Sequence, residues 1–188
     1  MKSEFEKFHD ALDLVQYEQF GELMNIIDAL DELRENNGTI YICGNGGSAS
    51  IATHIACDLA KIAGINAISL CTNIPLITAI TNDEGFDYIF EDQLRGMEYG
   101  DLLMVISVHG TIPRDDYEVW SQNLVRAVDY TRNYGNKAIS LTGFDGGMLK
   151  DITDYNININ IESTPIVESM HSIIGHIIAF NLKEVDRE

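Results

Sequence analysis

The chain has 188 residues, of which 45% are hydrophobic and 22% are charged. This composition is typical of one folded domain with its own core and excludes a disordered segment. The formal net charge of −18 opposes binding to nucleic acids and to anionic membranes, because both interactions depend on Lys and Arg.

No apolar run reaches the roughly 18 to 20 residues that a transmembrane helix needs. The N-terminal segment MKSEFEKFHD lacks the apolar stretch of a signal peptide, so we expect a cytoplasmic protein. The cysteines Cys43, Cys57 and Cys71 form no CxxC pair, and we expect all three to be reduced residues of the core.

Apolar residues recur at helical spacing from residue 3 to residue 36, and a change of phase near Gly21 predicts two helices or one bent helix. Gly38 is a stop signal for this segment. Apolar runs then alternate with helical stretches. We expect strands at residues 39–43, 67–71, 102–107, 138–142 and 156–161. This order predicts βαβ units, and hence a three-layer αβα sandwich around a mostly five-stranded parallel sheet.

The last predicted strand, NININI, alternates polar and β-branched residues, which is typical of an edge strand with one exposed face. The segment Ser163-Thr164-Pro165 follows it and predicts a helix start with a capping hydroxyl. The helix is expected from about residue 166 to 183. We expect a single domain over residues 1–188, with an N-terminal helical segment at 1–37 and an α/β core at 38–188.

Three predicted strands end in polar loops rich in glycine, and parallel sheets bind ligands at this end of their strands. The first loop is GNGGSAS from Gly44, where glycines allow backbone N–H groups to approach an anion at a helix N-terminus. The other two are SVHG at 107–110 and TGFDGG at 142–147. A tight turn explains any one of them, but three together indicate a sugar phosphate or nucleotide site.

Titratable residues lie on two of the predicted helices. His54 and Asp58 share one helical face at spacing i, i+4, which suits a metal site, an acid/base pair or an ordinary surface contact. The scarcity of charge around His54 predicts that it is buried. Glu168 and His176 lie roughly 80° apart around the last helix and could face one site. His171 is either a hydrogen-bond partner there or a residue of the core.

Several motifs together resemble the sugar isomerase (SIS) domain superfamily, and within it the enzymes that isomerise sedoheptulose 7-phosphate. The motifs are CGNGGSAS followed by His54, TAITNDEGFDYIF, LTGFDGG and VESMHSIIGH, and they extend over nearly the whole chain. The resemblance implies a flavodoxin-like fold. It also implies conversion of sedoheptulose 7-phosphate to D-glycero-D-manno-heptose 7-phosphate through an enediol, for the heptose of surface polysaccharides.

By position, the resemblance implies that Asp58 and His176 carry out the proton transfer, and that His54, Asp58, Glu168 and His176 bind zinc, with no organic cofactor. It implies a homotetramer, or a dimer of dimers, packed through the N-terminal helices. The implied substrate contacts are Asn45, Gly46, Gly47, Ser48, Asp83, Ser107, His109, Ser121 and Glu168.

The chain departs from the family pattern at three places. Asp58 replaces a Glu, which retracts the carboxylate by about 1.5 Å, and Glu168 replaces a Gln. The family's phosphate loop, Ser-Thr-Ser-Gly-Asn-Ser, is replaced by SVHG and an insertion of about nine residues before Ser121. His109 and Arg114 of this region are candidate cationic contacts for phosphate. The alternatives are an enzyme acting on a different sugar phosphate and a non-catalytic sugar-phosphate-binding subunit.

Overall fold

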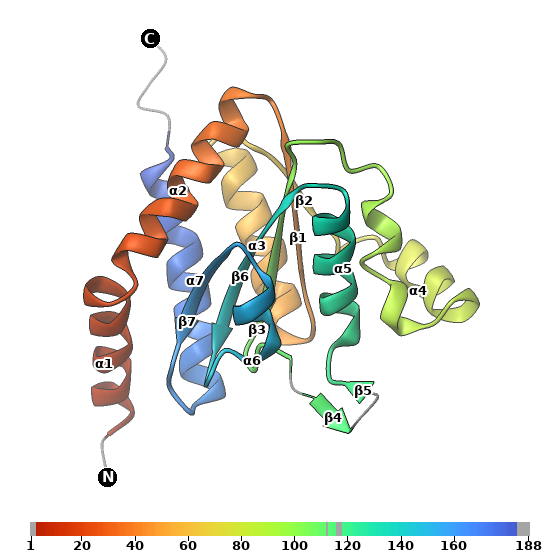
Figure 1. Ribbon diagram of the computed structural model, residues 1–188. Coiled ribbons are helices and arrows are strands. Elements are labelled where there is room, and N and C mark those ends of the chain that lie inside the picture. The colour runs from red at the N-terminus through yellow and green to blue at the C-terminus, as the bar shows by residue number, and fades with distance from the viewer. Residues whose placement is uncertain (1–2, 112, 116–117, 184–188) are drawn as a thin grey trace.

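The computed structural model describes residues 3–111, 113–115 and 118–183. Its centre is a sheet of five parallel strands in the order β2-β1-β3-β6-β7 (Figure 1). The strands are β1 (Thr39–Gly44), β2 (Asn66–Ser69), β3 (Leu102–Ser107), β6 (Lys137–Gly143) and β7 (Tyr155–Ile159). The predicted five-stranded parallel sheet is therefore confirmed.

Seven α-helices surround the sheet in the described part of the chain. They are α1 (Glu4–Tyr17), α2 (Phe20–Glu35), α3 (Gly47–Lys61), α4 (Ile74–Asp83), α5 (Gln122–Asn133), α6 (Gly147–Ile152) and α7 (Thr164–Asn181). Short 3₁₀ helices lie at Phe86–Tyr88 and Asp92–Leu94. A small antiparallel pair, β4 (Pro113–Asp115) and β5 (Glu118–Val119), occupies the predicted insertion.

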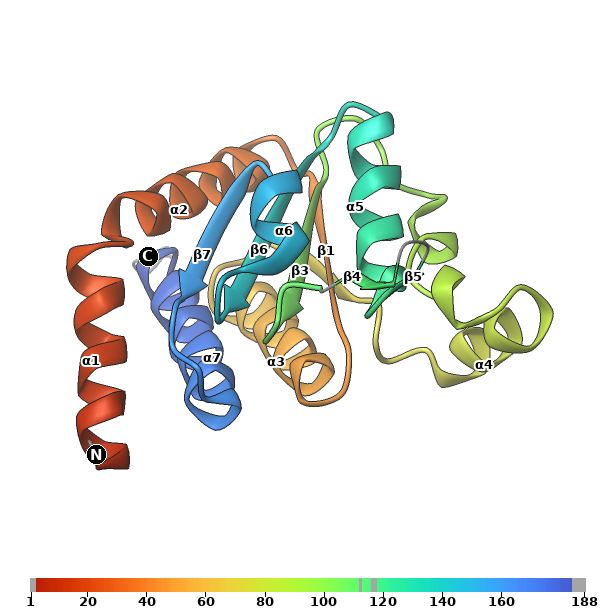
Figure 2. The ribbon, with the colours of Figure 1, turned by 60° about the horizontal axis from the view of Figure 1, so that its bottom comes forward.

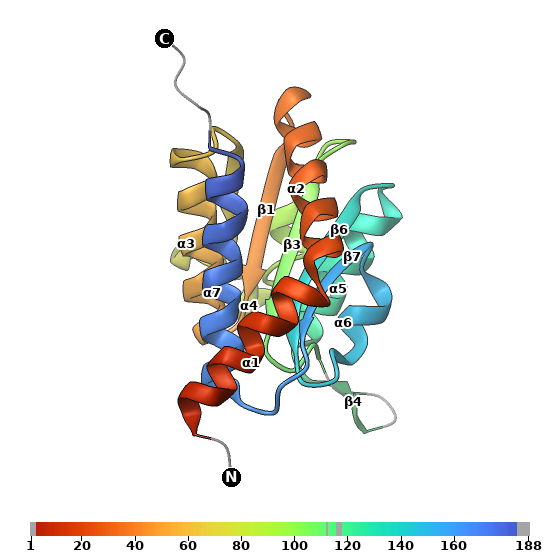
Figure 3. The same ribbon diagram turned by 90° about the vertical axis from the view of Figure 1, so that its left-hand side faces the viewer.

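The sheet separates two apolar cores, which makes the three layers seen edge-on in Figure 3. Successive side chains of β3 point to opposite faces of the sheet. Met104 and Ile106 face the core formed with α1, α2, α3 and α7, whereas Leu103 and Val105 face the core formed with α4, α5 and α6. Figure 2 shows α3 and α7 side by side beneath the first face. Both faces of the central strands are buried, as in other parallel sheets.

The N-terminal segment forms two helices, as one of the two alternatives predicted. Ser3 caps α1, because its hydroxyl accepts a bond from Glu6 N and the Glu6 carboxylate accepts one from Ser3 N at 2.6 Å. The predicted cap of α7 is wrong: Pro165 lies in the first turn, but the Ser163 side chain makes no capping bond. No helix in the described ranges has the length and apolar character that crossing a bilayer requires.

The strand β7 lies at the sheet edge, as predicted, but its polar face is only partly exposed, because Asn156 is half-buried and only Asn160 is exposed. Asn158 is buried there, because α6 covers the polar side of the strand and a hydrogen-bond network satisfies it. Asn156 Nδ2 donates to Thr142 Oγ1 at 2.9 Å, and Thr142 Oγ1 donates to Asn158 Oδ1 at 3.0 Å. The period-two pattern thus marks a face that is partly a hydrogen-bonded network around the buried Asn158 and partly open to solvent.

The cysteine prediction is correct for Cys43, which is buried, and wrong for Cys57, which is exposed. Cys57 lies three residues after His54 on α3, so both side chains belong to the same outward face of that helix. Cys71 is half-buried, and its thiol donates to the Gly44 carbonyl at 3.4 Å.

Candidate functional site

A pocket of about 240 Å³ lies where β1 and β3 end. The strand order reverses between these strands, and open parallel sheets bind ligands at such a switch point. Larger grooves of about 540 Å³ lie along β7 at the sheet edge and at the amino ends of β3 and β6, so neither lies at the carboxyl ends of β1 and β3. The pocket is lined by Asn45, Ser48, Ile106, Ser107, Val108, His109, Thr111, Trp120, Ser121, Leu124, Thr164 and Glu168.

The GNGGS loop is both a tight turn and a wall of this pocket. A side chain on Gly44 would place its Cβ 2.8 Å from the Ser48 carbonyl oxygen, and Gly46 has φ +56°. A Cβ on Gly47 would overlap Glu168 Oε1. The Glu168 carboxylate therefore lies against the N-terminus of α3, where the helix dipole favours negative charge.

The SVHG and TGFDGG loops bind each other. The N–H groups of Met148 and Leu149, at the start of α6, donate to the carbonyls of Thr111 and Gly110 at 3.1 and 2.9 Å. The His109 ring packs against Phe144 with 4.3 Å between ring centroids. SVHG contributes Ser107 and His109 to the pocket lining, but TGFDGG contributes no residue to that lining. The prediction that three loops converge on one ligand is therefore wrong for the third.

Ser121 is at the N-cap of α5 in a left-handed conformation, with φ 60° and ψ 42°. Its side chain makes no capping bond, and the residue lines the pocket. Asn123, two residues later, was missed by the sequence analysis and exchanges two hydrogen bonds with Asn45. Arg114, the other predicted phosphate contact, belongs to β4, and its side chain lies outside the described part of the structure.

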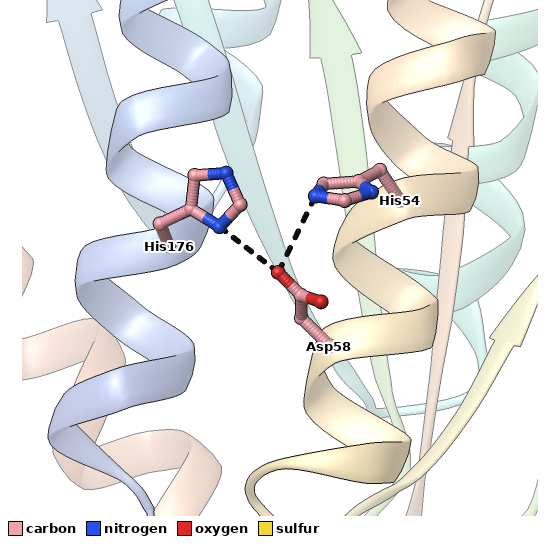
Figure 4. Close-up of side chains that lie close together, drawn as sticks. All are labelled: His54, Asp58 and His176. Carbon is pink, nitrogen blue, oxygen red and sulfur yellow. Dashed lines mark hydrogen bonds and ion pairs between the residues drawn. The ribbon is translucent and has the colours of Figure 1, made fainter.

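A second group of side chains lies further along α3 and α7 (Figure 4). His176 Nδ1 is 3.0 Å from Asp58 Oδ2, and His54 Nε2 is 3.5 Å from the same oxygen. The three ligand atoms lie within 4.8 Å of one another. The imidazole rings of His54 and His176 meet edge to face with centroids 5.0 Å apart. We call these residues the His-Asp-His cluster.

The cluster is open to solvent on one side. The side chains of His54 and His176 are 52% and 47% exposed, whereas that of Asp58 is only 13% exposed. The predicted burial of His54 is wrong, because about half of its side chain is open to solvent beside α7. A carboxylate held between two accessible imidazoles can serve as a base, an acid or a metal ligand.

Two predicted site residues lie apart from the cluster. Glu168 precedes His176 by eight residues, which is about 12 Å along a helix axis, and it is not among the ligand atoms of the cluster. The predicted four-ligand set is therefore not assembled in the structure. Asp83, at the end of α4, is exposed, accepts a bond from Asn82 Nδ2 at 2.8 Å and does not line the pocket.

His171 belongs to the core and not to the site. It is fully buried, and its Nε2 lies 3.0 Å from the Thr142 carbonyl oxygen, to which it donates. Its Nδ1 has no hydrogen-bond partner among the described residues. Burial lowers the pKa of His171 from 6.5 to about 4, so the imidazole is neutral near pH 7.

This burial predicts an acid-sensitive contribution to stability. Between pH 6.5 and 4 the unfolded chain protonates at His171 and the folded chain does not, so the free energy of unfolding falls as the pH falls through this window. When the pH is lowered from 7 to 4.5, the free energy of unfolding of the wild type should fall by about 2–3 kcal/mol more than that of the non-titrating variant His171→Gln. Urea denaturation at both pH values measures this, and parallel pH curves would contradict it.

The fold and the two groups of residues define an α/β enzyme with its ligand site at the ends of parallel strands. The family model described as "SIS domain" matches residues 5–143. A phosphoheptose isomerase of Nitratiruptor sp. is 37% identical over 159 residues, covering 81% of this chain and 80% of the relative. A phosphoheptose isomerase of Helicobacter pylori is 34% identical over 184 residues, covering 95% and 91%.

The solved structure of phosphoheptose isomerase GmhA from Neisseria gonorrhoeae superimposes with a TM-score of 0.84 at 29% identity, covering 95% of this chain and 94% of that one. The chain belongs to the SIS domain family, and within it to the phosphoheptose isomerases.

Proposed function

We propose that the protein interconverts sedoheptulose 7-phosphate and D-glycero-D-manno-heptose 7-phosphate through an enediol. The observation that carries the proposal is the 3.0 Å contact between His176 Nδ1 and Asp58 Oδ2, in a chain whose relatives are named phosphoheptose isomerase. In the reaction one group removes a proton from C1 of the ketose, and a proton is then delivered to C2 of the enediol. A carboxylate and an imidazole side by side suit these two tasks.

The relative positions of the pocket and the cluster support one orientation of the substrate. Ser48 lines the pocket at the start of α3, and His54 follows six residues later, about 9 Å along the axis. The seven-carbon chain of the sugar has six C–C bonds of about 1.5 Å each. If the phosphate lies near Ser107, His109 and Ser121, the sugar is therefore long enough for C1 and C2 to extend toward the cluster. Glu168, between the two, would accept hydrogen bonds from sugar hydroxyls.

The direct test is NMR of sedoheptulose 7-phosphate incubated with the protein in deuterated water. We expect the C1 and C2 signals of the aldose to appear, with deuterium at C2. Unchanged spectra with metal-loaded protein would contradict the proposal. A rise in melting temperature on adding the sugar phosphate, without turnover, would instead indicate the non-catalytic binding subunit, because a ligand that binds only the native state stabilises it.

We propose zinc as the metal of the His-Asp-His cluster. Two imidazole nitrogens and one carboxylate oxygen within 4.8 Å fit the three-ligand pattern of zinc sites that keep an open position. When bound, the ion would polarise the substrate oxygens. The residues of the chain supply the ligands from two helices, which fixes the angle between the imidazoles.

The zinc proposal predicts a loss of metal in His54→Ala. Elemental analysis should find close to one zinc per chain in the wild type and little in the variant. His9→Ala is the matched control, because His9 also pairs with an aspartate at i+4, Asp13, without a second imidazole. Equal, negligible zinc in all three proteins would contradict the site.

We also propose a homotetramer, or a dimer of dimers, in which the segment 1–37 contributes to packing. Phe5 on α1 is 89% exposed, and Tyr17 and Phe20 at the α1–α2 junction are exposed as well. Light scattering tests this proposal, and a monomer would contradict it. The cytoplasmic location predicted from the sequence stays a prediction.

A further inference from the structure

We propose that Asn123 is a positioning residue, which holds the two walls of the strand-end pocket at a fixed separation and so sets the affinity for the phosphate end of the substrate. Asn45 Nδ2 donates to Asn123 Oδ1 at 2.9 Å, and Asn123 Nδ2 donates to Asn45 Oδ1 at 2.9 Å. The pair joins the loop after β1 to the first turn of α5. This inference rests on the proposed function, which places phosphate in the pocket.

The pair is rigid because each amide orients the other. Rotating either amide by 180° would bring nitrogen against nitrogen and oxygen against oxygen, so both bonds would be lost together. Asn123 is fully buried, so its amide would be left without water or protein partners if the pair were broken. The two residues are 78 positions apart in the chain, so the contact is tertiary and not a local turn.

Each residue of the pair is next to residues that line the pocket. Asn45 itself and Ser48 form one wall. Ser121 and Leu124, on either side of Asn123, form the opposite wall. The pair therefore links the walls directly across the position where the strand order reverses.

The pair also explains how Ser121 keeps its unusual backbone. A non-glycine residue at φ 60° is strained and persists only where its surroundings hold it. Leu124 N donates to the Ser121 carbonyl at 2.9 Å, so the first turn of α5 begins at this residue. Anchoring Asn123 fixes that turn, and the Ser121 hydroxyl, free of any capping bond, stays available to a ligand.

We expect Asn123 to affect the binding of the substrate and not the rate of the chemical step. A phosphate held in the pocket is bound equally in the ground state and the transition state, so loosening the walls raises KM and leaves kcat unchanged. The His-Asp-His cluster lies on α3 and α7 and has no contact with Asn123 among the interactions of the described residues.

The experiment compares Asn123→Leu, which keeps the branching at Cγ but removes both hydrogen-bonding atoms, with Thr131→Val. Thr131 is also fully buried on α5, but its hydroxyl donates to Ala127 within the helix at 2.9 Å. Calorimetry with inorganic phosphate and with sedoheptulose 7-phosphate gives Kd, and turnover gives KM and kcat. We expect Asn123→Leu to raise both Kd and KM by about tenfold or more. Its kcat, and all constants of Thr131→Val, should stay within about threefold of wild type.

Unchanged Kd and KM in a folded Asn123→Leu protein would overturn the inference, as would a loss confined to kcat. If that variant does not fold, Asn123→Ser replaces it, since the shorter hydroxyl keeps a polar group but cannot span to Asn45. A wild-type protein that binds sedoheptulose 7-phosphate without turnover would contradict the proposed function alone, and Kd would still decide the role of Asn123. A wild-type protein that binds neither ligand would overturn both.

Discussion

Replacing Asp58 with asparagine is expected to lower kcat/KM by about 10²–10⁴-fold, the usual contribution of a positioned acid or base. The two side chains have the same shape, and the asparagine oxygen can still accept the bond that His176 Nδ1 makes at 3.0 Å. The amide cannot accept the substrate proton, however. The geometry of the cluster is thus retained while its basicity is removed, and steady-state kinetics with sedoheptulose 7-phosphate measures the difference.

Two further variants separate chemistry from folding. Cys57→Ser changes the neighbouring, exposed residue of α3 and should keep full activity. Asp58→Glu restores the residue that the family resemblance places here, moves the carboxylate outward by about 1.5 Å, and should keep measurable activity. An Asp58→Asn protein as active as Cys57→Ser would exclude Asp58 as the proton-transferring group.

The fold was predictable from the sequence because its determinants are local and periodic. The central strands β1, β3 and β6 are short apolar runs between turn residues, the edge strand β7 alternates polar and β-branched residues, and Gly21 lies near the junction of the two N-terminal helices. The strand ends were less accurate. The strand β2 ends at Ser69 and not at Cys71, and β7 ends at Ile159, after which Ile161 N donates back to the Ile159 carbonyl at 2.7 Å. Such tight turns depend on tertiary context.

The site was predictable only in part, because helical periodicity gives the angle between two side chains around the helix axis but does not show which side chains of other elements lie beside them. Glu168 and His176 share a face of α7, but Glu168 lies against Gly47 while His176 contacts Asp58. The burial of His54 was misjudged because a helix low in charge can still turn one face to solvent. Asn123 carried no signal of its own, since its role depends on a partner far away in the chain.

The altered phosphate loop also has a structural meaning that the sequence did not reveal. In place of a run of hydroxyl residues, the carbonyls of Gly110 and Thr111 accept the first N–H groups of α6. The loop is therefore fixed by the neighbouring TGFDGG loop, which holds Ser107 and His109 at the pocket. The proposed phosphate site then depends on how firmly these two loops are joined.

Gly110→Ala should for this reason be strongly destabilising. Gly110 has φ +62°, and a Cβ there would overlap the carbonyl oxygen of Gly146 and lie 3.0 Å from Gly147 N. These are backbone atoms, so they cannot move aside as a side chain would. We expect a loss of about 4 kcal/mol or more, equivalent to a fall in melting temperature of roughly 8–16 °C, measured by calorimetry.

The matched control is Gly21→Ala in α2, where an added Cβ meets nothing within 4 Å. Because alanine favours the helix, this variant should be as stable as wild type or more stable by up to about 1 kcal/mol. The comparison isolates the loop contact from the general effect of replacing a glycine. Equal melting temperatures for the two variants would mean that the SVHG and TGFDGG loops do not pack as described. In that case the position of His109 in the pocket would lose its support.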